Sequence, residues 1–306
     1  MNKPVHLTLP ATSANLGPAF DTAGLALNLN LEIKATPAQT FTLTATGRNA
    51  EICASLNQNL LLETYLQILQ ANEIRNPQPL AIEMQNEIPL GMGCGSSAAV
   101  RLAGAALANR YGDLNWSSDR ILTEASLLEG HPDNTAACWL GGFTVATLEN
   151  NAVHAATIQP PSDWRILLAL PQVPLATTKA RAMLPATYTR EDAVANIQRA
   201  SLLTAAFALG RGDLLRTAMQ DRLHQPYRTE ACPLLPVLLP LAGSNGILGA
   251  ALSGAGPAVL LIVESVAALP HAREAVLQVS RNCPGPASSD IELVDCEIQR
   301  TGARYS

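Results

Sequence analysis

The chain has 306 residues, of which 48% are hydrophobic and 15% are charged, and its formal net charge is −5. This composition argues against a disordered chain, a collagen-like repeat and a disulfide-rich scaffold. Because the sequence has no basic run, it also argues against a nucleic-acid-binding surface. A chain of this length buries a hydrophobic core without disulfides or structural metals.

The low charge raises the question of a membrane span. The longest uncharged run, residues 231–263, exceeds the ~18 residues that suggest a spanning helix, but prolines and glycines interrupt it repeatedly. Such a run is more typical of a short helix, a strand, a glycine-rich turn and a second strand. The N-terminus has no apolar signal region, and the cysteines form no CxxC pair, which fits free thiols in a reducing cytoplasm. The six cysteines are Cys53, Cys94, Cys138, Cys232, Cys283 and Cys296. The expectation is a cytoplasmic protein that contacts neither membrane nor nucleic acid.

In the first half of the chain, a Ser-, Gly-, Pro- and Asn-rich loop at 12–21 separates the first two predicted strands. Alternation of apolar and polar residues predicts strands at 5–9, 25–33, 41–46, 80–88 and 143–147. Helical spacing of apolar residues predicts helices at 59–74, 96–111 and 117–128. A glycine-rich loop begins at Pro89.

In the second half, Asn-Asn and Pro-Pro pairs within 149–163 predict a domain boundary, which gives domains at 1–155 and 156–306. Strands are predicted at 164–170, 247–252, 258–263 and 291–298. Helices are predicted at 177–184, 190–209, 213–223, 233–242 and 267–280, of which the fourth contains Pro236 and Pro240. Both halves mix strands and helices, so the predicted fold class is α+β with two domains.

The glycine-rich loop at 89–99 reads PLGMGCGSSAA and leads into an Ala-rich helix. Alternating glycines allow positive φ and let backbone N–H groups form an anion-binding nest, and the helix N-terminus favours a phosphate. The loop lacks the lysine of a P-loop and the spacing of a dinucleotide-binding motif. The alternative is a plain glycine-rich turn with a serine cap.

This loop resembles the phosphate loop of the GHMP kinases, the superfamily of galactokinase, homoserine kinase, mevalonate kinase and phosphomevalonate kinase. Further motifs resemble those of its homoserine kinase family, in the same order and spacing over nearly the whole chain. They are PATSANLGPAFD at 10–21, LEGHPDN at 128–134, TTKARAMLP at 177–185, HQPYR at 224–228 and LSGAGPA at 252–258.

The resemblance implies an N-terminal domain like domain 2 of ribosomal protein S5 and a ferredoxin-like C-terminal domain. It implies transfer of the γ-phosphoryl group of ATP, with Mg²⁺, to the side-chain hydroxyl of L-homoserine in threonine biosynthesis. It leaves a homodimer open.

The resemblance also assigns the nucleotide and metal residues. The residues assigned to nucleotide binding are Asn59, Pro89, Gly91, Met92, Gly93, Cys94, Gly95, Ser96, Ser97, Ala98 and Ala99. Ser97 and Glu129 match the positions that hold Mg²⁺, a hard cation that takes oxygen ligands. Asn59 has an alternative role as a helix cap, and Glu129 as a solvated carboxylate at a helix end.

For homoserine, the resemblance assigns Arg181 and Arg228 to the carboxylate, which a guanidinium holds in two hydrogen bonds. Asp21 pairs with the ammonium or the attacking hydroxyl, and Asn15 and Asn134 offer donors and acceptors. The alternatives are a surface arginine at 181, a turn closed by Arg228, and a loop held together by Asn15 and Asp21.

Asp21 and Asp133 are the predicted catalytic residues. His131 is a further candidate base because histidine titrates near neutral pH, although it lies between Gly130 and Pro132 and has an alternative role in shaping the loop. Phosphoryl transfer through a loose transition state needs little base assistance, so positioning and charge stabilisation are sufficient in principle.

Three residues depart from the family pattern. Ala19 replaces a usual glycine, which predicts a re-shaped loop because a Cβ disfavours positive φ. Cys94 replaces a usual leucine and is either inert or an oxidant-sensitive thiol at a helix N-terminus. Thr135 replaces a common valine, and we expect no effect from it.

Two other functions stay open at this stage. One is a kinase of the same superfamily for another small alcohol, such as mevalonate or shikimate. The paired arginines together with Asp21 and Asn134 favour an amino acid instead. The other is a non-catalytic nucleotide or amino-acid sensor, against which the intact Ser97 and Glu129 argue.

Overall fold

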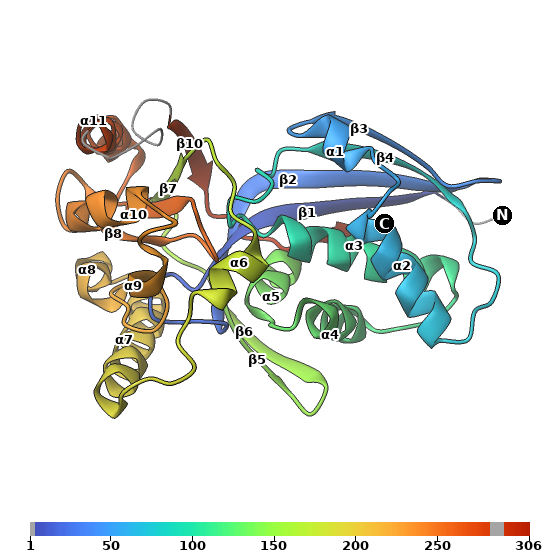
Figure 1. Cartoon of the computed structure of the whole chain (residues 1–306), viewed down its shortest axis with the longest axis horizontal. Helices are drawn as coiled ribbons and strands as arrows, with labels where there is room; N and C mark the ends of the chain where they lie inside the picture. The colour runs from blue at the N-terminus through green and yellow to red at the C-terminus, as the bar shows by residue number, and fades with distance from the viewer. Residues whose placement is uncertain (1–3, 282–290) are drawn as a thin grey trace.

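The computed structural model describes residues 4–281 and 291–306, so Cys283 lies outside the described residues. Figure 1 shows two halves side by side, each with its own sheet and helices, and the long strands β1 and β2 reach from one half to the border of the other. A mixed α and β architecture in two parts confirms the predicted fold class.

The first sheet has seven strands in the order β11-β1-β2-β4-β3, and β5 and β6 extend it from one end of β2. All pairs are antiparallel except β3–β4. The strands are β1 (Val5–Ala14), β2 (Ala23–Pro37), β3 (Thr42–Gly47), β4 (Leu80–Asn86), β5 (Phe143–Glu149), β6 (Ala152–Ile158) and β11 (Arg304–Tyr305).

The helices of this half are α1 (Ala50–Cys53), α2 (Leu60–Ala71), α3 (Ser96–Tyr111), α4 (Ser118–Glu129) and α5 (Asp133–Leu140). The Ala-rich α3 is buried along most of its length and packs against α2, α4, α5 and β1. A Cβ on Gly104 would lie 2.8 Å from the carbonyl oxygen of Leu61, so the small residue lets α2 approach closely. This packing fixes the start of α3, which the glycine-rich loop precedes.

The second sheet is antiparallel, with strand order β10-β7-β9-β8. Its strands are β7 (Arg165–Leu170), β8 (Ile247–Leu252), β9 (Val259–Val263) and β10 (Glu292–Glu297). When these four strands are numbered along the chain, their order across the sheet is 4-1-3-2. Helices connect the first strand to the second and the third to the fourth. This is the ferredoxin-like arrangement that the resemblance implies. Every residue of β9 is buried, which explains part of the long uncharged run. No helix of the described residues is long and apolar enough to cross a membrane.

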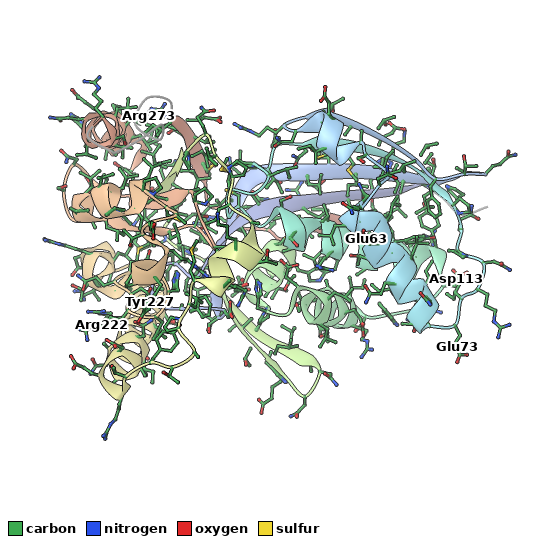
Figure 2. The ribbon with its side chains drawn as sticks, in the orientation of Figure 1. Glu63, Glu73, Asp113, Arg222, Tyr227 and Arg273 are labelled. Carbon is green, nitrogen blue, oxygen red and sulfur yellow. The ribbon has the colours of Figure 1, made fainter. Side chains whose placement is uncertain are left out.

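The helices of this half are α6 (Thr177–Ala182), α7 (Arg190–Leu209), α8 (Leu215–Ala218), α9 (Gln225–Arg228), α10 (Leu234–Leu238) and α11 (Leu269–Ser280), with 3₁₀ turns at Gly212–Leu214, Leu239–Leu241 and Val266–Ala268. In Figure 2, Arg222 and Tyr227 lie at the α7–α9 end, far from Glu63, Glu73 and Asp113 in the first half. Arg222 pairs there with Glu191 and Asp192 at the start of α7.

Several predicted boundaries are wrong. The first strand runs to Ala14, because Ala11, Thr12 and Ser13 continue its pairing with β2 after a bulge at Pro10. The helix expected at 213–223 is only a 3₁₀ turn and α8, and the one expected at 233–242 divides into α10 and a 3₁₀ turn, where Pro240 removes a backbone donor. Five short elements among residues 4–281 and 291–306 were not predicted from the sequence patterns: α1, α5, α9, β6 and β11.

The expected boundary at 149–163 contains β6, which forms a hairpin with β5 in the first sheet. The last described residues also return to this sheet, since β11 pairs with β1. The two halves join through aromatic packing, with Phe207 of α7 stacked on Phe143 of β5 at 4.1 Å between ring centroids. The division into 1–155 and 156–306 stays a prediction.

Candidate active site

A cavity of about 660 Å³ lies between the two halves and is lined from both. Most of the residues predicted for nucleotide, metal and substrate line it. They are Asn15, Asp21, Asn59, Pro89, Gly91, Gly93, Cys94, Gly95, Ser96, Ser97, Glu129, Asp133, Asn134, Arg181 and Arg228. Met92, Ala98 and Ala99 are not among its lining residues; the two alanines are fully buried. One cavity therefore contains both predicted binding regions.

The glycines of the loop are required by geometry. Gly91, Gly93 and Gly95 have φ of 69°, 75° and 72°, a region that costs other residues roughly 1–2 kcal/mol. A Cβ on Gly93 would lie 2.0 Å from the carbonyl oxygen of Ser253, and one on Gly95 would lie 1.9 Å from Thr12 Oγ1. No side chain fits at these two positions without displacing the strand or the loop that faces them.

Three of the loop carbonyls are held by neighbouring segments of the chain. They accept hydrogen bonds at 2.8–3.1 Å from Leu175 N to Gly91 O, from Ser253 Oγ to Gly93 O and from Thr12 N to Cys94 O. Within the described part of the chain, no backbone N–H of residues 92–98 donates a hydrogen bond to another residue. These donors, together with the N-terminus of α3, form an anion-binding surface without a lysine.

Cys94 is fully buried inside this loop. Burial raises the pKa of its thiol to about 12, although Ser253 and Arg48 oppose that shift. A redox-active cysteine needs an accessible thiol with a low pKa. The alternative of an oxidant-sensitive Cys94 is therefore wrong, and the side chain acts as a small core residue.

Asn59 is the N-cap of α2. Its Oδ1 accepts a hydrogen bond from Leu62 N at 3.3 Å, and its Nδ2 donates to the carbonyl of Ser55 at 3.0 Å. The helix-cap alternative thus describes what this side chain does in the structure. Asn59 also lines the cavity, so its contact with a nucleotide stays a prediction.

The predicted metal pair is in contact. Ser97 Oγ donates to Glu129 Oε2 at 2.7 Å, and Arg101 Nε donates to the same oxygen at 2.7 Å. Arg101 follows Ser97 by one helical turn on α3, so i,i+4 spacing was a signal for it that the sequence reasoning missed. The hydroxyl and the carboxylate suit a hard cation, and the ion pair with Arg101 shows that this position accommodates positive charge.

At the other end of the cavity, two predicted substrate residues bind each other. Arg181 of α6 donates to Asp21 through both terminal nitrogens, at 2.6 and 3.1 Å. Hydrogen bonding and the charge of Asp21 raise the pKa of Arg181. Both side chains are partly exposed to the cavity, so a zwitterionic ligand can replace each partner with one of its own charged groups.

Arg228 of α9 is only 1% exposed, despite its charge. Its Nε donates to Ala180 O at 3.2 Å, and its Nη1 donates to His224 Nδ1 at 3.0 Å and to Gly254 O at 3.4 Å. Burial, reinforced by the charge of Arg181, lowers the pKa of Arg228. Three segments thus hold its donors in place, and its binding of a substrate carboxylate stays a prediction.

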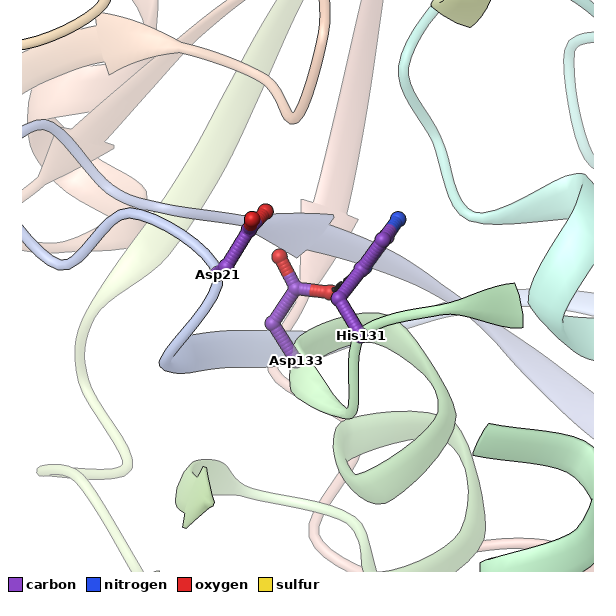
Figure 3. Close-up of side chains that lie close together, drawn as sticks. All are labelled: Asp21, His131 and Asp133. Carbon is purple, nitrogen blue, oxygen red and sulfur yellow. Dashed lines mark hydrogen bonds and ion pairs between the residues drawn. The ribbon is translucent and has the colours of Figure 1, made fainter. Parts of the chain in front are cut away.

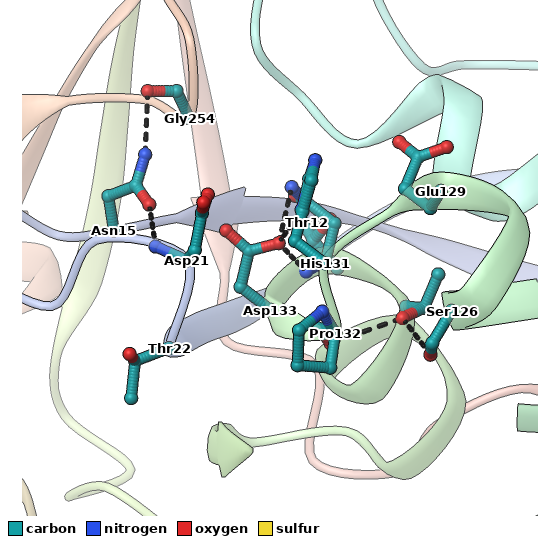
Figure 4. A network of polar contacts seen from close by, with 12 residues as sticks. Thr12, Asn15, Asp21, Thr22, Ser126, Glu129, His131, Pro132, Asp133 and Gly254 are labelled. Atoms are coloured by element: carbon teal, nitrogen blue, oxygen red, sulfur yellow. Dashed lines mark hydrogen bonds and ion pairs between the residues drawn. The ribbon is translucent and has the colours of Figure 1, made fainter. Parts of the chain in front are cut away.

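The loop from Asn15 to Asp21 is held by its own amide. Asn15 Oδ1 accepts from Asp21 N at 3.0 Å and its Nδ2 donates to Gly254 O at 2.9 Å (Figure 4). This is the loop-holding alternative for Asn15, which joins the loop to the second half. Ala19 has no positive φ, and Asn15, Leu16, Gly17 and Asp21 carry the positive φ values of this loop. The re-shaped loop expected from Ala19 stays a prediction.

His131 and Asp133 lie at the N-terminus of α5, beside Asp21 (Figure 3), and Asn134 is the next residue of that helix. His131 Nδ1 is 2.5 Å from Asp133 Oδ1, which also accepts from Asn134 N at 2.7 Å. Burial lowers the pKa of His131, but the hydrogen bond and the charges of Asp133 and Asp21 more than offset this, so its pKa is raised. Ligand atoms of Asp21, His131 and Asp133 all lie within 4.8 Å of one another.

Other side chains shape this end without having been predicted. Thr12 Oγ1 donates to Asn134 Oδ1 at 2.7 Å. The ring of Phe20 lies under both guanidinium groups, 5.5 Å from Arg181 and 5.6 Å from Arg228. Both residues lie in the motif at 10–21, in which the sequence prediction assigned roles only to Asn15 and Asp21.

Thr135 was expected to have no effect, but it is buried and its hydroxyl lies 2.6 Å from Ser126 Oγ and donates to Pro132 O at 3.1 Å. The hydroxyl joins the start of α5 to α4, a contact that valine does not make.

Comparison with known proteins follows this geometry. The family model described as "GHMP kinases N terminal domain" matches residues 59–142, and the model described as "GHMP kinases C terminal" matches residues 203–282. The fold, the loop and the cavity are thus those of a class of small-molecule kinases.

Among curated proteins, the chain is 45% identical to homoserine kinase of Solibacter usitatus over 85% of each chain, and 38% identical to that of Deinococcus radiodurans over 84% of each. Among solved structures, homoserine kinase from Cytophaga hutchinsonii is 25% identical with a TM-score of 0.82, covering 100% of this chain and 98% of that one. Galactokinase of Lactococcus lactis, at 13% identity, covering 99% of this chain and 95% of that one, with a TM-score of 0.70, shares the fold. The chain belongs to the homoserine kinase family of the GHMP kinases.

Proposed function

We propose that this chain transfers the γ-phosphoryl group of ATP to the side-chain hydroxyl of L-homoserine, giving O-phospho-L-homoserine for threonine biosynthesis in the cytoplasm. The observation that carries the proposal is a single cavity with a backbone anion-binding loop at one end and a set of paired charges at the other. Family membership supports the reaction, and the side-chain roles below are our assignments.

At the nucleotide end, the N–H groups of residues 92–98 and the start of α3 bind the phosphates of ATP. The positive φ values of Gly91, Gly93 and Gly95 turn these groups toward the cavity. Pro89, Ser96 and Asn59 line the neighbouring wall. Since neighbouring segments of the chain hold the loop, these donors need no reorganisation when phosphate binds.

Ser97 and Glu129 would hold Mg²⁺. The metal supplies charge neutralisation of the phosphate oxygens during transfer. Ser97 Oγ and Glu129 Oε2 already lie 2.7 Å apart, and Arg101 holds the carboxylate in place.

At the substrate end, Arg228 and Arg181 bind the carboxylate of homoserine, and Asp21 binds its ammonium. In the structure, Arg181 and Asp21 neutralise each other; homoserine exchanges that ion pair for two complementary ones, so no charge is left unpaired. Asn134, placed by Thr12, offers its amide to the same ligand. This exchange favours an amino acid over an alcohol that lacks the ammonium.

We assign Asp133 and Asp21, which both line the cavity, to the attacking hydroxyl of homoserine. Asp133 Oδ1 is engaged by His131 and by Asn134 N, which orients the carboxylate. Since the hydrogen bond to Asp133 Oδ1 occupies Nδ1 of His131, we assign His131 to holding Asp133 rather than to accepting the proton. The site thereby catalyses mainly by positioning.

The test is a coupled ADP-release assay across candidate alcohols with and without Mg²⁺. We expect turnover with L-homoserine, and little with mevalonate, shikimate or homoserine lacking its ammonium. Turnover with another alcohol and none with L-homoserine above the background ATPase would overturn the substrate. ATP binding by calorimetry with no phosphorylated product would favour a sensor.

A further inference from the structure

We propose that His224 is a positioning residue for homoserine binding: its neutral imidazole joins Arg228 of α9 to the loop at Gly17 and so holds the guanidinium in the cavity. This inference rests on the proposed function for its substrate. The residue belongs to the HQPYR segment, of which only Arg228 was assigned from the sequence.

The hydrogen bonds fix the protonation state of the ring. His224 Nδ1 lies 3.0 Å from Arg228 Nη1, and His224 Nε2 lies 2.7 Å from the carbonyl oxygen of Gly17. A guanidinium can only donate and a carbonyl can only accept. Nδ1 must therefore accept and Nε2 must carry the proton, so the ring is the neutral Nε2–H tautomer.

The ring is fixed on its other sides as well. His224 is 0% exposed, and Asp221 holds its backbone, since Asp221 Oδ2 accepts from His224 N at 2.9 Å. Phe20 stacks on the imidazole with 5.2 Å between centroids and also lies under the guanidinium groups of Arg181 and Arg228. A shift of the imidazole would therefore displace both arginines that are predicted to bind the carboxylate of homoserine.

Asp221 itself is buried and saturated. Its carboxylate also accepts from Asn196 Nδ2 at 2.7 Å, from Leu223 N at 2.9 Å and from Gln225 N at 2.7 Å. Asn196 Nδ2 also donates to Pro18 O at 3.2 Å. The network thus spans from α7 to α9 and reaches the loop at Gly17 and at Pro18.

A protonated ring would break this arrangement, because Nδ1–H would face the N–H of Arg228. The charged groups facing the ring are Asp221 and Arg228 on its own segment and Asp21 on the loop. Burial lowers the pKa of His224; Asp221 and Asp21 oppose this, and Arg228 adds to it, with a lowered pKa as the net result. The neutral form is thus favoured at neutral pH.

Two near-isosteric variants separate the two hydrogen bonds. In His224→Asn the amide oxygen replaces the Nδ1 acceptor for Arg228 and the bond to Gly17 is lost. In His224→Gln the amide N–H replaces the Nε2 donor to Gly17 and the acceptor for Arg228 is lost. We expect the Gln variant to raise the KM for L-homoserine about 10- to 100-fold, the range for a lost bond to a charged group. We expect the increase in the KM for L-homoserine to be several-fold smaller in the Asn variant than in the Gln variant. The KM for ATP should stay unchanged in both variants.

Equal KM values for homoserine in the two variants, or equal rises in the KM for ATP, would overturn the proposal. Should either variant fail to fold in a thermal-unfolding control, the ring nitrogens of the wild-type enzyme provide the second test. Their ¹⁵N chemical shifts should report the neutral Nε2–H tautomer at pH 7, and a proton on Nδ1 would overturn the assignment. A wild-type enzyme inactive on homoserine would refute the proposed function, whereas the ¹⁵N shifts would still test the contact with Arg228.

Discussion

The two ends of the cavity are built on different principles. The phosphate end is one continuous stretch of backbone whose donors are N–H groups and whose glycines exclude every side chain. The substrate end brings together charged side chains from segments far apart in the chain: Asp21, Asp133, Arg181 and Arg228. Substitutions that add atoms should therefore impair the phosphate end most. Substitutions that leave a charge without a partner should impair the substrate end most.

The largest expected effect is at the phosphate end. Gly95→Ala places a Cβ against Thr12 Oγ1 and demands positive φ from alanine, which must displace the N–H groups of the loop. We expect turnover to fall by about 100-fold or more, because displacements of about 1 Å near the reacting groups have that effect.

Gly210→Ala is the matched control for this variant. Gly210 also has positive φ, 65°, but its Cβ would meet only Pro161 at 3.0 Å, at the end of α7. It should cost stability, by about 1 kcal/mol, and leave turnover nearly unchanged. Equal turnover in the two variants would show that the loop geometry is not critical.

The next largest effect concerns Glu129, the carboxylate predicted to hold the metal. Glu129→Gln keeps the shape of the side chain but removes the charge that faces Ser97 and Arg101. We expect turnover to fall about 100-fold and the Mg²⁺ concentration for half-maximal activity to rise. Glu124→Gln on the same helix, whose partner is Arg120 at the surface, is the control. A Glu129→Gln enzyme with wild-type kinetics would remove Glu129 from the metal site.

At the substrate end, the two arginines should respond unequally. Lysine cannot reproduce the several directed donors of a guanidinium, and Arg228 is buried whereas Arg181 is partly exposed. We expect Arg228→Lys to raise the KM for homoserine about 10- to 100-fold and Arg181→Lys to raise it less. Steady-state kinetics at saturating ATP measure the KM for homoserine of both variants. A larger increase for Arg181→Lys than for Arg228→Lys would contradict the effect expected from the burial of Arg228.

The smallest expected effect is a difference between His131 and His224 in how their contributions to folding stability depend on pH. The raised pKa of His131 means that its contribution to stability is present below about pH 6.5, the ordinary histidine pKa, and is lost as the pH rises through the folded pKa. The lowered pKa of His224 has the opposite sign: its contribution is present above about pH 6.5 and is lost as the pH falls toward the folded pKa.

Denaturant unfolding of His131→Asn and His224→Asn between pH 5 and 8 tests this contrast. Relative to wild type, His224→Asn should lose less stability toward pH 5, and His131→Asn should lose less toward pH 8. Identical pH profiles for the two variants would contradict the opposite shifts.

The accuracy of the sequence predictions differs between the same two ends. The phosphate loop, the start of α3 and Ser97 lie in one stretch, so local spacing was enough to place them. Arg101 lies one turn further on and was missed, although helical spacing pointed to it. The short elements α1, α5, α9, β6 and β11 were missed because four to eight residues, or two in the case of β11, carry too little periodicity.

Tertiary contacts also changed the meaning of residues that the sequence had found. Asn15 was predicted for substrate, yet both ends of its amide are used within the loop and on Gly254. Cys94 stands at a helix N-terminus, which by itself favours a thiolate, yet complete burial raises its pKa. Desolvation outweighs the local dipole there, and burial is not visible in the local sequence.

The sequence by itself determined the α+β class, the strands of both sheets except β6 and β11, and the phosphate loop, because each depends on periodicity or on backbone freedom within about ten residues. Only the tertiary structure decided that Arg181 pairs with Asp21, that Arg228 is buried and that a neutral His224 directs it. The physical reason is that a buried charge is stabilised by partners that the fold brings from distant parts of the chain, and those partners leave no local pattern.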